Sequence, residues 1–409
     1  MKVVSTEVLR SRLSGLPGTP RVVASGNMAV PWQALRVVDE ALERYTLNVL
    51  NGPPGLPDRE GVTLETCFVG AGQRRSPRLR YVPSRLSLVP LLFGHTLAPD
   101  VVLLHCAPPR NGAVSLGVET NVLPAALEAC RARGGLVVAV LNPRMPYTFG
   151  DAQVPVEHVD LALEVDEQLP VAAEAGPLDE AGQAIGERIA ARIGDGATLQ
   201  TGIGAIPDAV LGGLAQHRGL RVWTEMFSDG VLALDRDGVL DETVPITSSF
   251  CFGSAELYEW IDGNPRVRML RTERTNDPGL IAQQPAMTSI NSALEVDLFG
   301  QANASRIDAR IHSGFGGQTD FIVGALHSPG GQSLIGLRSW HPRADVSAVV
   351  PLLDEPVTSF QQSAIVTEQG VADLFGRSEK EQAAAIIEQA AHPRVREELW
   401  DEARELGLA

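Results

Sequence analysis

The sequence alternates between short apolar runs and segments with helical periodicity, and this alternation constrains the fold more than any other feature. Residues 136–141 are apolar throughout, which is typical of a parallel strand buried on both faces. Before this run, apolar residues recur at helical spacing over 121–133, and Gly134 and Gly135 end the helix. Residues 101–104 form another apolar run upstream, and the turn-forming residues 108–112 are expected to close it. These segments predict a β-α-β unit, because parallel strands need a crossover connection.

A second β-α-β unit is predicted in the other half of the chain. Its strands are expected at 197–200 and 220–223, and its helix at 207–216. Between the two units, residues 165–185 are acidic, rich in alanine and interrupted by two prolines, a composition typical of an interdomain segment. We therefore place a domain boundary near residue 175.

The fold class that follows is α/β, with two open domains of mainly parallel sheet. The N-terminal domain is expected to span 1–175, and the C-terminal domain 176–409. Within the latter, Ser378 and Glu381 form a capping box that opens a helix, and a last helix follows His392 and Pro393.

The charge balance excludes several classes of partner. Acidic residues outnumber basic ones by 50 to 34, which gives a net charge of −16. Such a chain lacks the basic surface that nucleic acids and anionic membranes require. It also has no apolar run of 18 residues and no apolar leader segment at the N-terminus. We therefore expect a cytoplasmic protein with no nucleic-acid and no membrane partner.

Lysine, cysteine and histidine usage excludes common cofactor chemistry. Lys2 and Lys380 are the only lysines, and neither lies in a context suited to a P-loop or to a pyridoxal Schiff base. The four cysteines are far apart and flanked by small or apolar residues, so buried free thiols are expected. The eight histidines show no metal-ligand spacing, and we expect no metal site.

A glycine-rich loop, Gly-Ile-Gly-Ala-Ile at 202–206, follows the strand at 197–200 and opens the next helix. Such a loop directs backbone N–H groups and the positive helix end toward an anion above the sheet. Pro207 stands where the dinucleotide-binding fingerprint would have its third glycine, so the loop is not that fingerprint. A plain tight turn explains the pattern equally well.

Glu225 gives this loop a possible chemical role. It lies 23 residues beyond Gly202, just after the next strand. In a right-handed β-α-β unit both strands end at the same edge of the sheet, so Glu225 should lie beside the loop. A carboxylate facing several N–H donors is a nucleophile next to an oxyanion hole. The spacing is explained equally well if Glu225 is a strand-end residue that is exposed to solvent or ion-paired.

Two further segments contain candidate residues. The loop at 312–321 has three glycines in four positions, Gly314, Gly316 and Gly317, which suggests close backbone approach to a ligand or to another loop. Glu295 and Asp297 alternate with apolar residues and could form an acid–base pair, but a solvated strand face is the preferred interpretation.

Taken together, these motifs resemble the family I coenzyme A transferases. More specifically, they resemble the acetyl-CoA hydrolase/transferase branch, which includes 4-hydroxybutyrate CoA-transferases and succinyl-CoA:acetate CoA-transferases. The likeness covers almost the whole chain and rests on motifs in the same order, at 106–112, 142–146, 202–207, 224–230, 290–297, 313–321 and 366–370.

The resemblance implies two α/β domains of the CoA-transferase (NagB/RpiA-like) type, the second carrying the catalytic glutamate and both glycine loops. It implies an acyl-CoA:carboxylate CoA-transferase for short-chain acids such as acetate, butyrate or 4-hydroxybutyrate. The reaction would be ping-pong, through a glutamyl-CoA thioester. Coenzyme A would be a substrate, no cofactor would be needed, and the protein would be a homodimer.

The same resemblance assigns roles to individual residues. Glu225 would be the nucleophile, and the N–H groups of Ile206 and Gly317 would form the oxyanion hole. The residues implied in CoA binding are Gly202, Ile203, Gly204, Ala205, Ile206, Ser313, Gly314 and Gly317.

Two departures from the family pattern stand out. Arg110 and Asn111 replace the Asp and His that relatives commonly carry. Pro329 and Gln332 flank the Gly-Gly pair at 330–331, beside which relatives often place a lysine. The CoA phosphates would then need arginines, for which Arg310 and Arg338 are candidates. The sequence also leaves open an acyl-CoA hydrolase, a CoA-binding protein without turnover and, more distantly, a sugar-phosphate isomerase.

Overall fold

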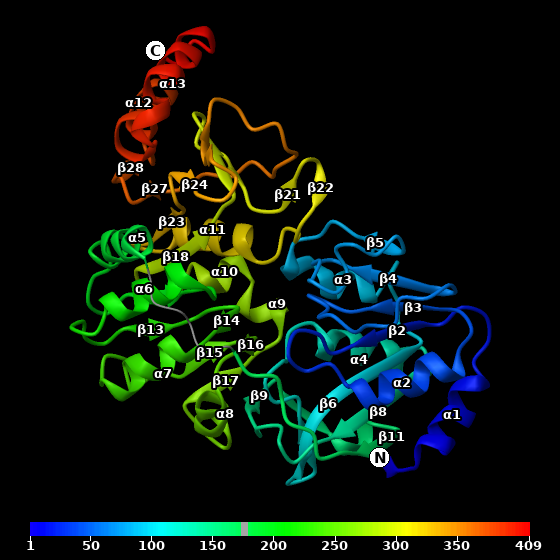
Figure 1. Ribbon diagram of the computed structural model, residues 1–409. Helices are drawn as coiled ribbons and strands as arrows, with labels where there is room; N and C mark the ends of the chain where they lie inside the picture. The colour runs from blue at the N-terminus through cyan, green and yellow to red at the C-terminus, as the bar shows by residue number, and fades with distance from the viewer. Residues whose placement is uncertain (173–178) are drawn as a thin grey trace. The chain divides into compact units, whose positions relative to one another are not determined.

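The computed structural model describes residues 1–172 and 179–409, and the chain forms two compact units (Figure 1). Unit 1 comprises Met1–Ala173, Pro245–Thr275 and His312–Gly316, and unit 2 comprises Glu174–Val244, Asn276–Ile311 and Gly317–Ala409. Two segments from the second half of the chain thus belong to unit 1. The boundary expected near residue 175 lies outside the described residues.

Unit 1 is built on a sheet whose eight principal strands are all parallel. Their spatial order is β1 (Lys2–Val3), β11 (Leu161–Glu164), β8 (Leu136–Leu141), β6 (Val101–Arg110), β2 (Arg21–Ala24), β3 (Tyr45–Asn48), β4 (Val62–Thr66) and β5 (Leu79–Tyr81). The helices of this unit are α1 (Thr6–Ser14), α2 (Trp32–Ala41), α3 (Val89–Phe93), α4 (Leu123–Ala132), α8 (Ala255–Ile261) and α9 (Thr272–Thr275). A smaller parallel sheet contains β15 (Ile246–Ser248), β17 (Val267–Met269) and β9 (Phe149–Gly150).

The β-α-β unit expected first is confirmed, because β6, α4 and β8 follow one another and β8 is buried along its whole length. The end of β6 differs from expectation. Instead of a turn over 108–112, the strand continues through Pro108 and Pro109 before a turn joins it to β7 (Ala113–Ser115). The prolines cost few ladder bonds there, because the parallel pairing with β8 ends at Cys106 and the pairing with β7 is irregular between Ala107 and Arg110.

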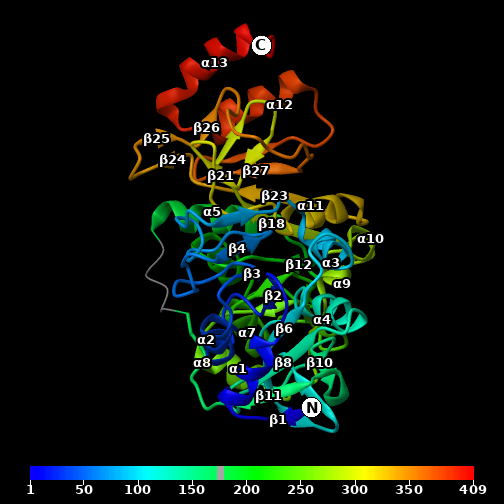
Figure 2. The same cartoon turned by 90° about the vertical axis from the view of Figure 1, so that its right-hand side faces the viewer.

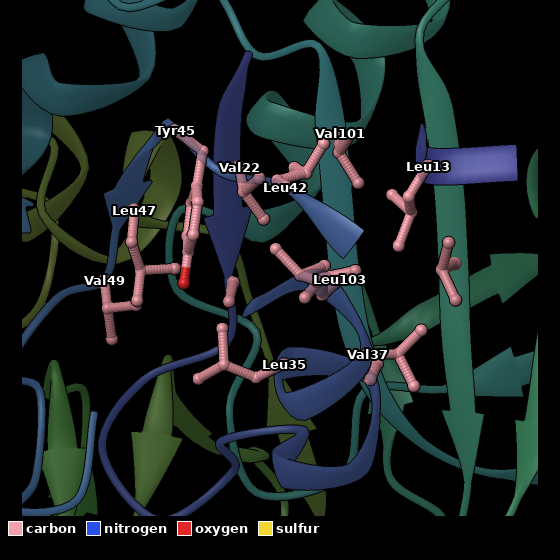
Figure 3. Packing of buried hydrophobic residues seen from close by; sticks show 14 of the residues in the cluster. Leu13, Val22, Leu35, Val37, Leu42, Tyr45, Leu47, Val49, Val101 and Leu103 are labelled. Atoms are coloured by element: carbon pink, nitrogen blue, oxygen red, sulfur yellow. The ribbon is translucent and has the colours of Figure 1, made fainter. Parts of the chain in front are cut away.

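The core of unit 1 lies under α1 and α2, on one face of the sheet. Alternate residues of neighbouring strands point to this face, as the period of two requires (Figure 3). Val22, Tyr45, Leu47 and Leu103 are fully buried there, and the Tyr45 hydroxyl donates a hydrogen bond to the carboxylate of Asp39 on α2 at 2.9 Å. The apolar residues thus specify the register, since a one-residue slip would turn them all to the other face.

Unit 2 has a six-stranded sheet that is parallel except for its last strand. Its order is β13 (Arg221–Val222), β12 (Thr198–Gln200), β18 (Met287–Ser292), β23 (Gln332–Gly336), β27 (Ala364–Val366) and antiparallel β28 (Val371–Asp373). Its helices are α5 (Glu180–Ala190), α6 (Ala205–Gly213), α7 (Asp229–Arg236), α10 (Pro278–Ile281), α11 (Gln318–His327), α12 (Glu379–Ala385) and α13 (Arg396–Glu405). Short strands complete it: β14 (Met226–Phe227), β19 (Glu295–Asp297), β20 (Ala302–Asn303), β21 (Arg306–Ile307), β22 (Arg310–Ile311), β24 (Trp340–His341), β25 (Val346–Ser347) and β26 (Val349–Val350).

The C-terminal helices follow the sequence signals. The capping box of Ser378 and Glu381 is present at α12, and α13 begins after His392 and Pro393. Figure 2 shows these helices near β27, and Ile386 and Leu399 join the apolar core on this side of unit 2. The α/β class with open, mainly parallel sheets is therefore confirmed.

The four cysteines are all buried, and no disulfide joins any of them in the part of the chain that the structure describes. Across residues 1–172 and 179–409, no helix is long and apolar enough to span a membrane.

Candidate functional site

The loop at 202–206 connects the carboxyl end of β12 to α6. Gly204 is the N-cap residue of α6 and has a φ of 116°, a conformation that side chains with a Cβ rarely adopt. Helix α6 begins at Ala205, two residues earlier than expected, so Pro207 stands third in the helix, where its missing N–H costs no intrahelical bond. Gly204 and Ala205 are exposed, and Ile203 is 52% exposed, so the loop presents its backbone outward.

Thr224 connects this loop to Glu225. Its hydroxyl accepts a hydrogen bond from the N–H of Thr201 at 3.3 Å, and its single O–H has two carbonyl acceptors within reach, Thr201 O at 3.0 Å and Met226 O at 2.8 Å. Thr201 directly precedes Gly202, and Thr224 directly precedes Glu225. One buried hydroxyl therefore holds together the two segments that the spacing places at one edge of the sheet.

The carboxylate of Glu225 lies against Gly317 and Asn276, all within unit 2. Asn276 donates a hydrogen bond from Nδ2 to Glu225 Oε2 at 2.8 Å. Gly317 is the N-cap residue of α11, and a Cβ on it would overlap both the Oε2 of Glu225 and the Nδ2 of Asn276. Only glycine lets the carboxylate approach the start of α11 this closely. Sterically, therefore, position 317 requires a residue without a side chain.

The environment of Glu225 raises the pKa of its carboxyl group above the value that a glutamate has in water. Burial, together with the negative charge of Asp320, raises the pKa of Glu225 to about 7. The hydrogen bond from Asn276 acts in the opposite direction, because it stabilises the ionised form. A carboxyl group with such a pKa at a helix N-terminus is a candidate for chemistry near neutral pH.

The second glycine loop is divided between the two units. Ser313, Gly314 and Gly316 belong to unit 1, where the Ser313 carbonyl accepts a hydrogen bond from the N–H of Val69 at 2.6 Å. Gly314 has a φ of 150°, and a Cβ there would lie 2.8 Å from the carbonyl oxygen of Cys67. Glu225, Gly317 and the loop at 202–206 belong to unit 2.

The other charged candidates have structural partners. Glu295 accepts a hydrogen bond from Asn303 Nδ2 at 2.8 Å. The solvated strand face expected for Asp297 is wrong: this residue is buried, and it accepts bonds from the N–H groups of Phe299 and Gln301 in the turn that follows. Burial accordingly raises the pKa of Asp297.

Arg310 and Arg338, the candidates for CoA phosphate binding, and Arg110, a departure from the family pattern, have different surroundings. Arg338 forms a bidentate pair with Asp179, at 2.5 and 2.6 Å. Arg110 pairs with Asp262 at 3.3 Å and lies over the ring of Tyr147. Arg310 is exposed on β22.

Asn276 and Asp320 were missed by sequence reasoning as partners of Glu225. Asn276 is 51 residues from Glu225, and its only local signal is the Asp-Pro that caps α10. Asp320 lies within the second glycine motif, but nothing in the motif distinguishes it from an ordinary first-turn acid of a helix. Among the described residues, no group of three or more histidine, cysteine or acidic side chains is arranged to hold a metal ion.

Comparison with known proteins supports the family expected from the motifs. The family model for the acetyl-CoA hydrolase/transferase C-terminal domain matches residues 253–403. The 4-hydroxybutyrate coenzyme A transferase of Clostridium kluyveri is 38% identical over 350 residues, which cover 82% of this chain and 80% of that protein. The chain belongs to the acetyl-CoA hydrolase/transferase family. It is an enzyme of the CoA-transferase type.

Solved structures resemble this chain over nearly its whole length. The 4-hydroxybutyrate CoA-transferase of Porphyromonas gingivalis matches with a TM-score of 0.83 and 31% identity, over 99% of this chain and 98% of that one. RipA from Yersinia pestis matches with a TM-score of 0.92 and 27% identity, over 100% and 98%. Both matches agree with the α/β class described above.

Proposed function

We propose that this CoA-transferase moves CoA between short-chain acyl-CoA thioesters and free carboxylates, with Glu225 as the nucleophile. The observation that carries the proposal is the packing of the Glu225 carboxylate against Gly317 at the start of α11, beside the amide of Asn276. Backbone N–H groups at a helix N-terminus and a side-chain amide are donors suited to the oxyanions that form during acyl transfer.

The first half-reaction would load CoA onto the enzyme. An oxygen of the Glu225 carboxylate attacks the thioester carbonyl, the C–S bond breaks, and CoA thiolate leaves an acyl-glutamyl anhydride. The thiolate then attacks the glutamyl carbonyl carbon, which releases the acyl group as a carboxylate and leaves a glutamyl-CoA thioester.

The second half-reaction runs these steps in reverse with another acid. The incoming carboxylate attacks the glutamyl thioester, and the released thiolate attacks the acyl carbonyl of the new anhydride. A new acyl-CoA departs and the Glu225 carboxylate is restored. No net proton, water or nucleotide is consumed, because the thioester energy is retained in the covalent intermediate.

In this proposal the glycine loops contribute backbone N–H groups. Ile206 lies in the first turn of α6, where N–H groups have no intrahelical acceptor, and Gly317 lies at the start of α11. The N–H groups of these two residues would form the oxyanion hole. The loop at 202–206 would bind CoA, together with Ser313 and Gly314.

The ionisation of Glu225 would set the pH dependence of the reaction. Only the carboxylate is nucleophilic, and the pKa of Glu225 is raised to about 7. We therefore expect kcat/KM to rise with pH through about 7 and then to level off.

The test supplies acetyl-CoA with and without butyrate and follows both free CoA and butyryl-CoA. A transferase forms butyryl-CoA without net release of CoA, whereas CoA release that ignores butyrate would identify a hydrolase. Borohydride reduction during turnover, followed by peptide mass analysis, should modify a peptide that contains Glu225.

Two variants sharpen the result. Glu225→Gln should lose transfer, and Glu295→Gln, which changes a carboxylate hydrogen-bonded to Asn303 in the same unit, should retain it. Loss in both variants, or a borohydride-modified peptide without Glu225, would contradict the assignment of the nucleophile.

By resemblance to the family we also propose that units 1 and 2 correspond to its two α/β domains and that the protein is a homodimer. Light scattering of the purified protein tests the dimer directly, since a monomer has a mass of 43.6 kDa.

A further inference from the structure

Helix α11 carries a buried acidic residue in its first turn, close to Glu225. Gly317 is the N-cap of this helix, and the Oε2 of Glu225 lies where the Cβ of a larger residue at 317 would be. Asp320 follows three residues later, so its side chain lies on the same face of the helix as position 317, with about 5–6 Å between the two Cβ positions. The carboxyl groups of Asp320 and Glu225 are therefore near neighbours within unit 2.

The two carboxyl groups differ in their access to solvent. Glu225 is half-buried and can be reached by a substrate, whereas Asp320 is fully buried and cannot. Asp320 lies in the first turn of α11, where the helix stabilises an ionised acid. Burial and the charge of Asp320 both oppose the ionisation of Glu225. Asp320 can thus influence the reaction only through Glu225.

The proposed half-reaction removes a negative charge from this site. The Glu225 carboxylate and an acyl-CoA give the glutamyl-CoA thioester and a free carboxylate. The acyl C–S bond breaks, a new C–S bond forms at the glutamyl carbonyl carbon, and one glutamyl oxygen leaves with the released acid. The negative charge departs with that acid. The thioester at position 225 is therefore neutral, as the protonated carboxyl group is.

We propose that Asp320 is a positioning residue that acts through Glu225 and stabilises the glutamyl-CoA intermediate relative to the free carboxylate. The charge of Asp320 repels the ionised side chain of Glu225 but not the neutral thioester, so thioester formation relieves the repulsion. The inference rests on Glu225 being the nucleophile of the proposed function.

The test measures two quantities that depend on the same charge. The first is the equilibrium ratio of glutamyl-CoA enzyme to free enzyme, read by intact-protein mass spectrometry after incubation with a fixed ratio of acetyl-CoA to acetate. The incubation is kept well above the pKa of Glu225, so that the free carboxylate is ionised. The second is the pH profile of kcat/KM.

Removing the charge should change both quantities in a defined direction. In Asp320→Asn the ratio should fall by about tenfold, and the rise of kcat/KM should move to lower pH by about one pH unit. The two changes should match in size, because protonation and thioester formation neutralise the same carboxylate.

Three further variants separate charge from structure. Asp320→Ser removes the charge without adding an amide and should give the same two changes. Asp320→Glu keeps the charge and should retain most of both wild-type values. Asp297→Asn removes another buried carboxylate of unit 2 and should change neither quantity.

The outcomes distinguish this inference from the proposed function. The inference is overturned if Asp320→Asn or Asp320→Ser, folded as judged by thermal unfolding, keeps the wild-type ratio. A ratio that falls without the change in the pH profile, or equal changes in Asp297→Asn, would also overturn it. A wild type that forms no adduct on Glu225 would instead overturn the nucleophile, and this inference with it.

Discussion

Gly317→Ala tests how far the geometry around Glu225 controls activity. The new Cβ would occupy space that the Oε2 of Glu225 and the Nδ2 of Asn276 now fill, so the carboxylate has to move by about 1 Å to regain a normal contact. The backbone of Gly317 imposes no further penalty, because its φ of −98° is accessible to alanine. The steric conflict therefore falls on two side-chain ends and leaves the main chain free of strain.

The expected effect is large on catalysis and small on stability. A displacement of about 1 Å at a reacting group can lower the rate by about 100-fold, equivalent to about 2.7 kcal/mol of transition-state free energy. The ends of the Glu225 and Asn276 side chains can swing aside, so the melting temperature should change by only a few degrees. The assay is kcat/KM for CoA transfer from acetyl-CoA to butyrate, together with thermal unfolding of the same samples.

Gly194→Ala is the matched control. Gly194 lies in the same unit, and no heavy atom would contact its Cβ within 4 Å, so the same methyl group enters open space. If Gly317→Ala keeps activity close to that of Gly194→Ala, the carboxylate does not need the position that the structure gives it, and the reasoning is refuted.

Three further predictions follow from the same structure. Asn276→Ala removes the hydrogen bond that lowers the pKa of Glu225. The rise of kcat/KM with pH should therefore move from about pH 7 to higher pH. An unchanged pH profile would mean that Asn276 does not control the ionisation of Glu225. Glu119 is 2% exposed and burial raises its pKa to about 7, so the folded state retains a proton that the unfolded state releases above about pH 4.5. Glu119 should therefore contribute a loss of up to about 3 kcal/mol of stability between pH 5 and 8, in addition to the loss from Glu225, and denaturant titrations of Glu119→Gln should show a smaller loss than those of the wild type. Gly204→Ala should cost about 1–2 kcal/mol, because the φ of 116° strains a residue with a Cβ. Gly212→Ala in the same helix is the control and should be neutral or stabilising by up to about 1 kcal/mol, because alanine favours a helix more than glycine does.

Local patterns in the sequence predicted the framework of the protein. The six apolar residues of β8, the helical spacing of α4 and the capping box at Ser378 were each sufficient to predict the element that the structure contains. These signals are reliable because periodicity and capping depend on neighbours within a few residues. The end of β6 was mispredicted, because the tolerance of Pro108 and Pro109 depends on which partner strands extend that far.

The candidate site required information that no local pattern contains. From the spacing alone, Glu225 could equally well be a nucleophile or an exposed or ion-paired glutamate. The structure distinguishes it from Glu295 through the groups packed around it: Gly317, Asn276 and Asp320 come from segments 51 to 95 residues away. Desolvation and charge act through space, so a carboxyl pKa depends on contacts that only the folded chain brings together.

The sequence by itself thus determined the α/β class, the parallel sheets and the motifs that mark the family. The tertiary structure alone decided that Gly317 must lack a side chain, that Asn276 donates to Glu225, and that Asp297 is buried. The physical reason is the range of the interactions: backbone preferences are local, whereas close packing and burial join residues that are distant in the chain.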